Sequence, residues 1–363
     1  MIGAGVIGLA ISYNLSMRGK KVILVEKEKQ FGTGISSRSS EVIHAGIYYN
    51  KGSLKSRLCI RGKELLYEFC NKYSVRHDRI GKLFIAVSDD EISRLEIINK
   101  NAIENGLINL IELDSKQLKK IEPFIRGKSA LLSPSTGIID SHGLMQALMN
   151  LNDSYGTMYA VLSTVLGAER NNFGWSVKIG GVEPITITSR AIVNAAGLYS
   201  LELSKKIFPE RSIPKANPVK GGYVRYSGKS PIKHIVYPAI IPGKIEERVD
   251  ATPDLSGSLR FGPSVEKTNG FEDFSFSSEI INRFIPAIKR YLPDLDVSKL
   301  HLDQAGIRPK IIVDSERNPD FIIDWADDSG WLDLWGIESP GLTASLAIGE
   351  HVSNMFNESG LFN

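Results

Sequence analysis

The sequence predicts an α/β fold in which a parallel sheet with covering helices is joined to an inserted α+β domain with a mostly antiparallel sheet. Continuous apolar runs at Val22–Val25 and Ala191–Val193 are typical of buried parallel strands, and a further strand is expected at Leu332–Trp335. Alternating and turn-rich segments lie between these runs and indicate antiparallel strands. The chain has 363 residues, enough for about two domains.

We expect the parallel part to be discontinuous, because its strands lie at the start, in the middle and at the end of the chain. Its segments are residues 1–80, 141–215 and 303–363. The inserted domain, which we expect to bind the substrate, takes residues 81–140 and 216–302.

Helical spacing of apolar residues predicts a helix over 54–73. Further helices are expected at 89–105, 141–151 and 277–291 and from Thr343 onward, and a hairpin at 175–179 and 185–188. Cys59 and Cys70 lie eleven residues apart in the first helix, show no metal or disulfide spacing, and are expected to be buried and reduced.

The chain begins with the pattern Gly3-x-Gly5-x-x-Gly8, and Glu26 ends the next strand. Gly3 allows a tight turn, Gly5 lets a pyrophosphate approach the backbone, and Gly8 lets the following helix pack against the strand. The helix N-terminus offers N–H groups to phosphates, and Glu26 can bind ribose hydroxyls. Together these features predict a Rossmann-type dinucleotide site.

The first strand of that site is nearly absent, since only Met1 and Ile2 precede Gly3. This predicts a shortened N-terminus and a weakened central strand. The apolar start lacks a positive leading segment and is rich in glycine, which argues against a signal peptide.

Two further segments suit a flavin. In GIESPGLTASL at 336–346, the helix start at Gly341, Leu342 and Thr343 can point N–H groups at a flavin carbonyl. An ordinary helix start with Thr343 near the cap is the alternative. The hydroxyl-rich loop 32–40 can reach the pyrophosphate and ribityl chain, or it is a plain polar loop.

Two side chains are candidates for chemistry. His44 is flanked by small residues, so it can bond a flat ring or act as a base, although a structural role is the alternative. Arg308 precedes Pro309, and a fixed guanidinium can hold a carboxylate with two hydrogen bonds, although it can also be a surface residue.

In this order the segments resemble the D-amino acid oxidase superfamily of flavoproteins, and within it the L-2-hydroxyglutarate dehydrogenase/oxidase family. The segments that carry the resemblance are MIGAGVIGLA at 1–10, SSRSSEVIHAGIYY at 36–49, VNAAG at 193–197, VKGGY at 219–223, LRFGP at 259–263, AGIRPK at 305–310 and IESPGLTASLAI at 337–348. They span essentially the whole chain.

The resemblance implies FAD as cofactor and no metal. The implied FAD-binding residues are Gly3, Gly5, Gly8, Glu26, Ser36, Ser37, Gly197, Gly341, Leu342 and Thr343. It also implies that Arg308 holds the α-carboxylate of the substrate and that His44 lies beside the flavin ring.

The sequence departs from the family at Asp250, where a histidine is common, within the charged stretch KIEERVD at 244–250. We therefore expect His44 to be the base, with Asp250 second. A second substrate carboxylate needs another cation, for which Lys220, Arg260 and Lys310 are unranked candidates, and Tyr223 is a further candidate substrate contact.

The implied reaction is oxidation of a small 2-hydroxy acid, with L-2-hydroxyglutarate giving 2-oxoglutarate as the main hypothesis. Oxidation of an amine or of glycerol 3-phosphate, and a non-catalytic flavin-binding protein, are the alternatives. Quinone and oxygen are both open as electron acceptors. The net charge of +3 is small and spread along the chain, which excludes a nucleic-acid surface. The expected location is the cytoplasm, with peripheral contact at the inner membrane as an open alternative.

Overall fold

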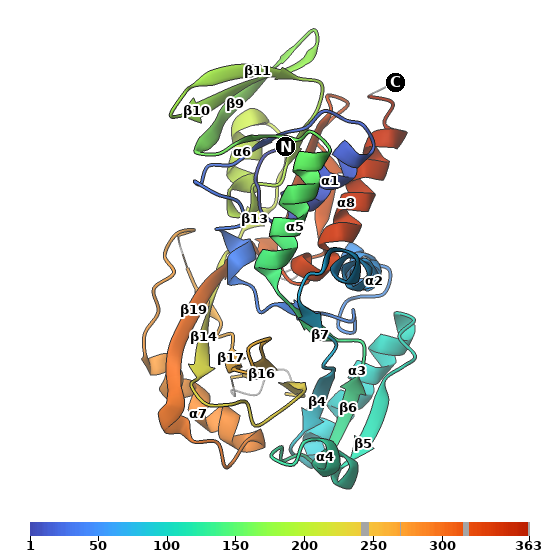
Figure 1. The fold of residues 1–363 in the computed structure, drawn as a ribbon, viewed down its shortest axis with the longest axis vertical. Coiled ribbons are helices and arrows are strands. Elements are labelled where there is room, and N and C mark those ends of the chain that lie inside the picture. Colours follow the sequence, from blue (N-terminus) through green and yellow to red (C-terminus); the bar gives the residue numbers. More distant parts are fainter. Residues whose placement is uncertain (241–246, 269, 315–318, 362–363) are drawn as a thin grey trace.

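The computed structural model describes residues 1–240, 247–268, 270–314 and 319–361. Figure 1 shows an elongated molecule with both termini in its upper half, together with the helices α1, α5, α6 and α8. The lower half holds a large sheet with α7 and α4 near the lower end.

The upper half contains the predicted parallel sheet. From one edge to the other it consists of β8 (Met158–Ala160), β1 (Ile23–Val25), the bridging residue Ile2, β12 (Ile192–Asn194), β22 (Trp331–Trp335) and the antiparallel β21 (Ile322–Trp325). Ile2 stands for the short first strand, because it forms parallel bridges to both Val25 and Asn194. Its amide donates to the carbonyl of Val193 at 2.9 Å, so even this short strand is paired on both sides.

Helices cover this sheet, and α1 packs at glycine contacts against the preceding turn and against α8. They are α1 (Val6–Met17), α2 (Leu54–Tyr73), α5 (Ser141–Ser154), α6 (Ser200–Ile207) and α8 (Gly341–Glu358). A Cβ added to Gly8 would lie 1.9 Å from the Gly3 carbonyl oxygen, and one added to Gly349 would lie 2.6 Å from that of Ala10. The role predicted for Gly8 in helix packing is therefore confirmed.

The lower half is built on a mixed sheet of nine strands within the described chain. Its order is β18 (Glu266–Lys267), β14 (Val219–Tyr226), β17 (Leu259–Gly262), β16 (Asp250–Pro253), β15 (Ile235–Pro238), β4 (Lys82–Ala86), β6 (Ser129–Ser133) and β5 (Ile111–Asp114), with β19 (Leu300–Arg308) also paired to β14. Only β15 and β4 pair in parallel among the neighbours named, so the sheet is mostly antiparallel, as predicted. It packs with α7 (Glu279–Tyr291), α3 (Ile92–Glu104) and α4 (Ser115–Ile121).

Smaller sheets complete the fold. They are β2 (Val42–Ile43), β7 (Gly137–Ile139) and β3 (His77–Asp78); β9 (Ser163–Asn171), β10 (Gly174–Gly181) and β11 (Ile185–Ser189); and β13 (Lys215–Ala216) with β20 (Ile311–Ile312). The division into two domains remains a prediction, and two strands cross its limits. Strand β19 runs through residue 303 within the large sheet, and β7 pairs with strands of the first segment.

Local sequence signals explain several element ends. Helix α2 begins and ends at the predicted residues, and the Ser53 side chain caps it by accepting from the Ser56 amide at 3.1 Å. Asp140 caps α5 in the same way. Cys59 and Cys70 are buried and unbonded to each other, as predicted.

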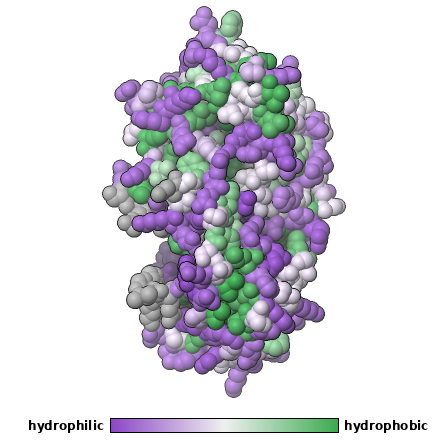
Figure 2. Space-filling model, turned by 90° about the vertical axis from the view of Figure 1, so that its left-hand side faces the viewer, coloured by the Kyte–Doolittle hydropathy of each residue, from purple (hydrophilic) through white to green (hydrophobic). Residues whose placement is uncertain are grey.

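The surface shows no broad apolar face in the view of Figure 2, where hydrophilic residues surround separate hydrophobic areas. Among the described residues, no helix has the length and hydropathy required to cross a membrane.

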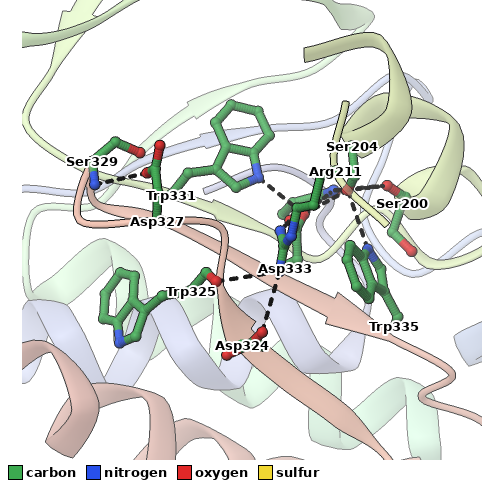
Figure 3. Close-up of polar contacts among 11 residues, drawn as sticks. Ser200, Ser204, Arg211, Asp324, Trp325, Asp327, Ser329, Trp331, Asp333 and Trp335 are labelled. Carbon is green, nitrogen blue, oxygen red and sulfur yellow. Dashed lines mark hydrogen bonds and ion pairs between the residues drawn. The ribbon is translucent and has the colours of Figure 1, made fainter. Parts of the chain in front are cut away.

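A buried polar cluster ties the two central strands β12 and β22 to α6 (Figure 3). Asp333 is fully buried and accepts hydrogen bonds from Asn194 at 2.8 Å and Ser204 at 2.6 Å. The Trp331 indole donates to it at 2.9 Å, and Arg211 forms an ion pair at 2.6 Å. A carboxylate with this many donors stabilises the sheet only while its partners are present.

We predict that Asp333→Ala lowers the free energy of unfolding by about 3–5 kcal/mol, because Arg211 would lose its buried partner. The matched control is Asp324→Ala, which removes the 65% exposed partner of the same Arg211 and should cost less than about 1 kcal/mol. Urea unfolding of both variants measures the difference, and equal losses would contradict this account of the cluster.

Candidate active site

A cavity of about 1420 Å³ lies where the N-terminal glycine turn, the start of α8 and the large sheet meet. Gly3, Glu26 and Gly197 line one part of it, and His44 and Arg308 line another. Pockets for drug-sized ligands span about 300–1,000 Å³, so this cavity has room for a dinucleotide and a small second molecule.

The glycine turn fits a dinucleotide. Gly3 has a φ of +94°, and a Cβ there would lie 2.6 Å from the Ala195 carbonyl oxygen, so only glycine suits the turn. Helix α1 begins directly after Gly5, with its N-terminus at the cavity. Glu26 is held at the cavity wall by the Ala4 amide, which donates to its carboxylate at 2.7 Å. These groups would hold pyrophosphate and ribose.

Seven of the ten predicted cofactor-binding residues line the cavity. They are Gly3, Gly5, Glu26, Ser36, Gly197, Gly341 and Leu342. Gly8, Ser37 and Thr343 are not among the lining residues. Gly8 packs against Gly3, and Ser37 donates to the Gly34 carbonyl at 3.0 Å, which holds its own loop.

Thr343 joins the two ends of the chain. Its hydroxyl accepts from the His44 amide at 3.0 Å and donates to the Val42 carbonyl at 3.2 Å. Thr343 lies in the first turn of α8, which begins at Gly341 after Pro340 with no side-chain cap. Thr343 instead fixes the backbone of His44 beside the start of α8.

His44 faces the cavity with one ring edge and a lysine with the other. Its Nε2 lies 3.4 Å from Ser339 Oγ, and both residues line the cavity. Its Nδ1 lies 3.4 Å from Lys82 Nζ. Burial, followed by the charges of Lys82 and Arg248, holds the pKa of His44 well below its usual value. The imidazole is therefore neutral at neutral pH.

Arg308, at the end of β19, lines the cavity beside Tyr223. Burial raises the pKa of the Tyr223 phenol, while the charges of Arg308 and Arg260 oppose that rise. In the part of the chain that the structure describes, the Arg308 guanidinium forms no ion pair with a carboxylate. A cation of this kind can bind an anionic ligand without first breaking a salt bridge.

Asp250, the second candidate base, is already engaged. Both of its oxygens accept from Arg248, at 2.7 and 2.9 Å, and the pair lines the cavity. The Arg248 guanidinium lies 4.7 Å from the centre of the Tyr237 ring, and neighbouring negative charge raises its pKa despite burial. Both oxygens of this carboxylate are therefore engaged by a guanidinium rather than facing the cavity without a partner. Sequence reasoning overlooked Arg248, although the unusual charge of KIEERVD marked its segment; residues 241–246 lie outside the described residues.

The three lysine and arginine candidates for binding a second substrate carboxylate differ in whether they line the cavity. Lys220 pairs with Asp273 at 3.2 Å and Arg260 with Asp303 at 2.6 Å, and neither lines the cavity. Both side chains thus lie with acid partners away from the cavity wall. Lys310 lines the cavity, as does Tyr223, and pairs with Glu338 at 3.1 Å.

Sequence reasoning also missed Lys82, the first residue of β4. It is 2% exposed, and its ammonium lies 3.9 Å from the centre of the Tyr237 ring. Burial lowers its pKa to about 7; the charge of Asp250 opposes this shift, and the charge of Arg248 adds to it. The signal was a charged residue directly before the apolar run LFIA at 83–86.

We predict that Lys82→Met raises the free energy of unfolding by about 4 kcal/mol at pH 7. The lowered pKa means that the unfolded chain binds a proton that the folded chain resists, so the penalty is largest at and below pH 7. It fades as the pH rises toward 10.5, the usual lysine value. Urea unfolding at fixed FAD concentration from pH 6 to pH 10 measures this gain. The control Lys63→Met, at a less buried lysine, should gain much less. A gain that grows with pH would contradict the assignment.

The glycine turn at a parallel sheet, the distant helix start and the half-buried Arg308 define a flavin-dependent oxidoreductase. The family described as FAD dependent oxidoreductase, of the D-amino acid oxidase type, matches residues 1–355. The chain therefore belongs to this family of FAD-dependent oxidoreductases. Among its relatives is the mitochondrial L-2-hydroxyglutarate dehydrogenase of Arabidopsis thaliana, 35% identical over 98% of this chain and 82% of that protein.

Other relatives broaden the comparison. The human mitochondrial L-2-hydroxyglutarate dehydrogenase is 28% identical over 96% of this chain and 86% of that protein. A glycerol 3-phosphate dehydrogenase of Caloramator mitchellensis is 29% identical over 97% of this chain and 72% of that protein. The fold matches the dithionite-reduced L-α-glycerophosphate oxidase of Mycoplasma pneumoniae with FAD bound, with a TM-score of 0.88, 24% identity and coverage of 98% and 93% of the two chains.

Proposed function

We propose that this protein oxidises L-2-hydroxyglutarate to 2-oxoglutarate with FAD as its cofactor. One observation carries the proposal: Arg308 and His44 line the same cavity, and the described chain gives the guanidinium no acid partner. An acid-binding cation near a neutral imidazole suits a 2-hydroxy acid, whose carboxylate and hydroxyl lie on adjacent carbons. The relatives named L-2-hydroxyglutarate dehydrogenases support the choice of acid.

Each residue has a distinct part in this proposal. When bound, FAD supplies the acceptor for the hydride that leaves the α-carbon. Arg308 binds the α-carboxylate and so fixes the α-carbon, with Tyr223 as a further contact at the same wall. The hydroxyl faces His44, whose Nε2 takes its proton. The cofactor would be held by the seven cavity-lining residues of the glycine turn, Glu26, the 32–40 loop, Gly197 and the α8 start.

The second carboxylate of the substrate needs a cation inside the cavity. Arg248 and Lys310 are the candidates that the structure supports, because both line the cavity. Each already has an acid neighbour, Asp250 for Arg248 and Glu338 for Lys310. A short dianion can share such a cation, and the existing partner keeps its side chain in place.

The finer physiological setting is part of the same proposal. We propose a quinone or oxygen as the final electron acceptor. We propose the cytoplasm as the location, with peripheral membrane contact as the alternative. Glycerol 3-phosphate is the competing substrate, favoured by the Caloramator relative.

Anaerobic reduction of the purified yellow protein tests the substrate. L-2-Hydroxyglutarate should bleach the flavin absorbance, whereas D-2-hydroxyglutarate, glycerol 3-phosphate and amino acids should not. Bleaching by glycerol 3-phosphate alone would replace the proposed substrate. Colour without bleaching by any of them would leave a flavin-binding protein without this activity.

We predict that Arg308→Met lowers kcat/KM for L-2-hydroxyglutarate by about 30- to 1000-fold, mostly through KM, since loss of a charged clamp costs about 2–4 kcal/mol. The matched control is Arg225→Met, an arginine of β14 that pairs with Asp254 and does not line the cavity. Steady-state kinetics with both variants decide the point. Equal kinetics for Arg308→Met and the unaltered protein would refute the clamp.

A further inference from the structure

Behind His44 lies a second titratable group that the reaction as described does not use. Lys82 Nζ is 3.4 Å from His44 Nδ1, and Lys82 is not among the residues that line the cavity. The other ring nitrogen, Nε2, is the one near Ser339 at the cavity wall. The imidazole therefore stands between the cavity and a buried amine.

The surroundings leave Lys82 with few partners. Within the described chain, His44 is the hydrogen-bond partner that the structure gives its amine. Lys55, which is also buried, instead has an ion pair with Glu338 at 3.2 Å and donates to the Pro319 carbonyl at 2.9 Å. Among the described residues, the amine of Lys82 thus faces a neutral base and no carboxylate at hydrogen-bond distance.

The other titratable neighbours of Lys82 in the described chain do not change their charge near neutral pH. Asp250 and Arg248, from β16 and the chain before it, neutralise each other. Burial raises the pKa of Cys59 on α2 to about 12 and that of Tyr237 on β15 well above its usual value, so both are uncharged. Proton exchange in this cluster at neutral pH is left to Lys82 and His44.

Resting on the proposed function, we infer that Lys82 is a positioning residue that sets the tautomer of His44 and receives its second proton. An ammonium at Lys82 can only donate, so Nδ1 must accept and Nε2 must carry the hydrogen. In that state Nε2 cannot act as a base. A neutral amine accepts from the Nδ1 hydrogen, and the Nε2 lone pair then faces the cavity.

The proton transfer balances without another reactant. The substrate hydroxyl gives its proton to Nε2 while the α-hydrogen leaves with its electron pair to the oxidised flavin. The Nδ1 proton passes to Lys82 Nζ, which becomes an ammonium, and His44 ends neutral with hydrogen on Nε2. Loss of the Nε2 proton to water in the emptied cavity, with return of one proton from Lys82 to Nδ1, then restores the starting state.

The position of Lys82 also places this switch near neutral pH. Burial holds its pKa at about 7. The active tautomer of His44 should thus dominate above pH 7 and the inactive one below it. For a single titrating group, the rate of flavin reduction should be about tenfold lower at pH 6 than at pH 8.

The first test reads the tautomer directly and needs no substrate. In the FAD-loaded protein labelled with ¹⁵N-histidine, His44→Gln identifies the His44 signals among those of the six histidines. We expect hydrogen on Nε2 at pH 6 and on Nδ1 at pH 8. Lys82→Arg, which stays charged, should keep hydrogen on Nε2 at both values, and Lys82→Met should abolish the change. The control Lys63→Met should retain it.

The second test uses single-turnover reduction of the flavin by L-2-hydroxyglutarate. The reduction rate of Lys82→Arg should fall at least about tenfold at pH 8 with little change in apparent substrate affinity, and Lys82→Met should lose the step near pH 7. A tautomer change near pH 7 that persists in Lys82→Arg overturns the inference, as does an Nδ1 hydrogen at every pH in the unaltered protein. The proposed substrate is contradicted on its own if L-2-hydroxyglutarate does not bleach the flavin although the tautomer change is still observed.

Discussion

Close contact between the two ends of the chain is the constraint on which the rest of the structure depends. Glycines allow it: a Cβ on Gly62 of α2 would lie 2.3 Å from the Thr343 carbonyl oxygen, and Gly349 of α8 meets α1 just as closely. This packing brings the α8 start to the glycine turn that begins with Gly3, and Thr343 then fixes the His44 backbone. One cavity results, with dinucleotide contacts on one side and the imidazole on the other.

Three cations lie in or beside the cavity, of which Lys82 is buried, Arg308 is half-buried and Arg248 is exposed. Asp250 neutralises Arg248. Burial lowers the pKa of Lys82 to about 7, so its amine loses its charge near neutral pH. Arg308 has no acid partner in the described chain. A buried cation without a counter-ion is costly unless a ligand supplies the negative charge. This distribution favours an anionic substrate at Arg308 and leaves His44 neutral, which a proton acceptor requires.

Much of this arrangement could be predicted from the sequence, and the reasons for the rest are physical. Periodicity and glycine spacing placed α2, α5 and the parallel strands, because these depend on local patterns. The resemblance placed His44 and Arg308, which line the cavity. Partners across the large sheet were not predictable, because register sends Arg260 to Asp303 and because Lys82 reads as one charged residue before an apolar run.

The central claim is that Arg308 and His44 contact the same small acid. Arg308 binds its α-carboxylate, and His44 faces the hydroxyl on the neighbouring carbon. A crystal structure of the FAD-loaded protein with 2-oxoglutarate tests it most directly. The account predicts the α-carboxylate on the Arg308 guanidinium and the keto oxygen within hydrogen-bond distance of His44 Nε2. A product bound with its α-carboxylate on another cation, or with its keto oxygen away from His44, would contradict it.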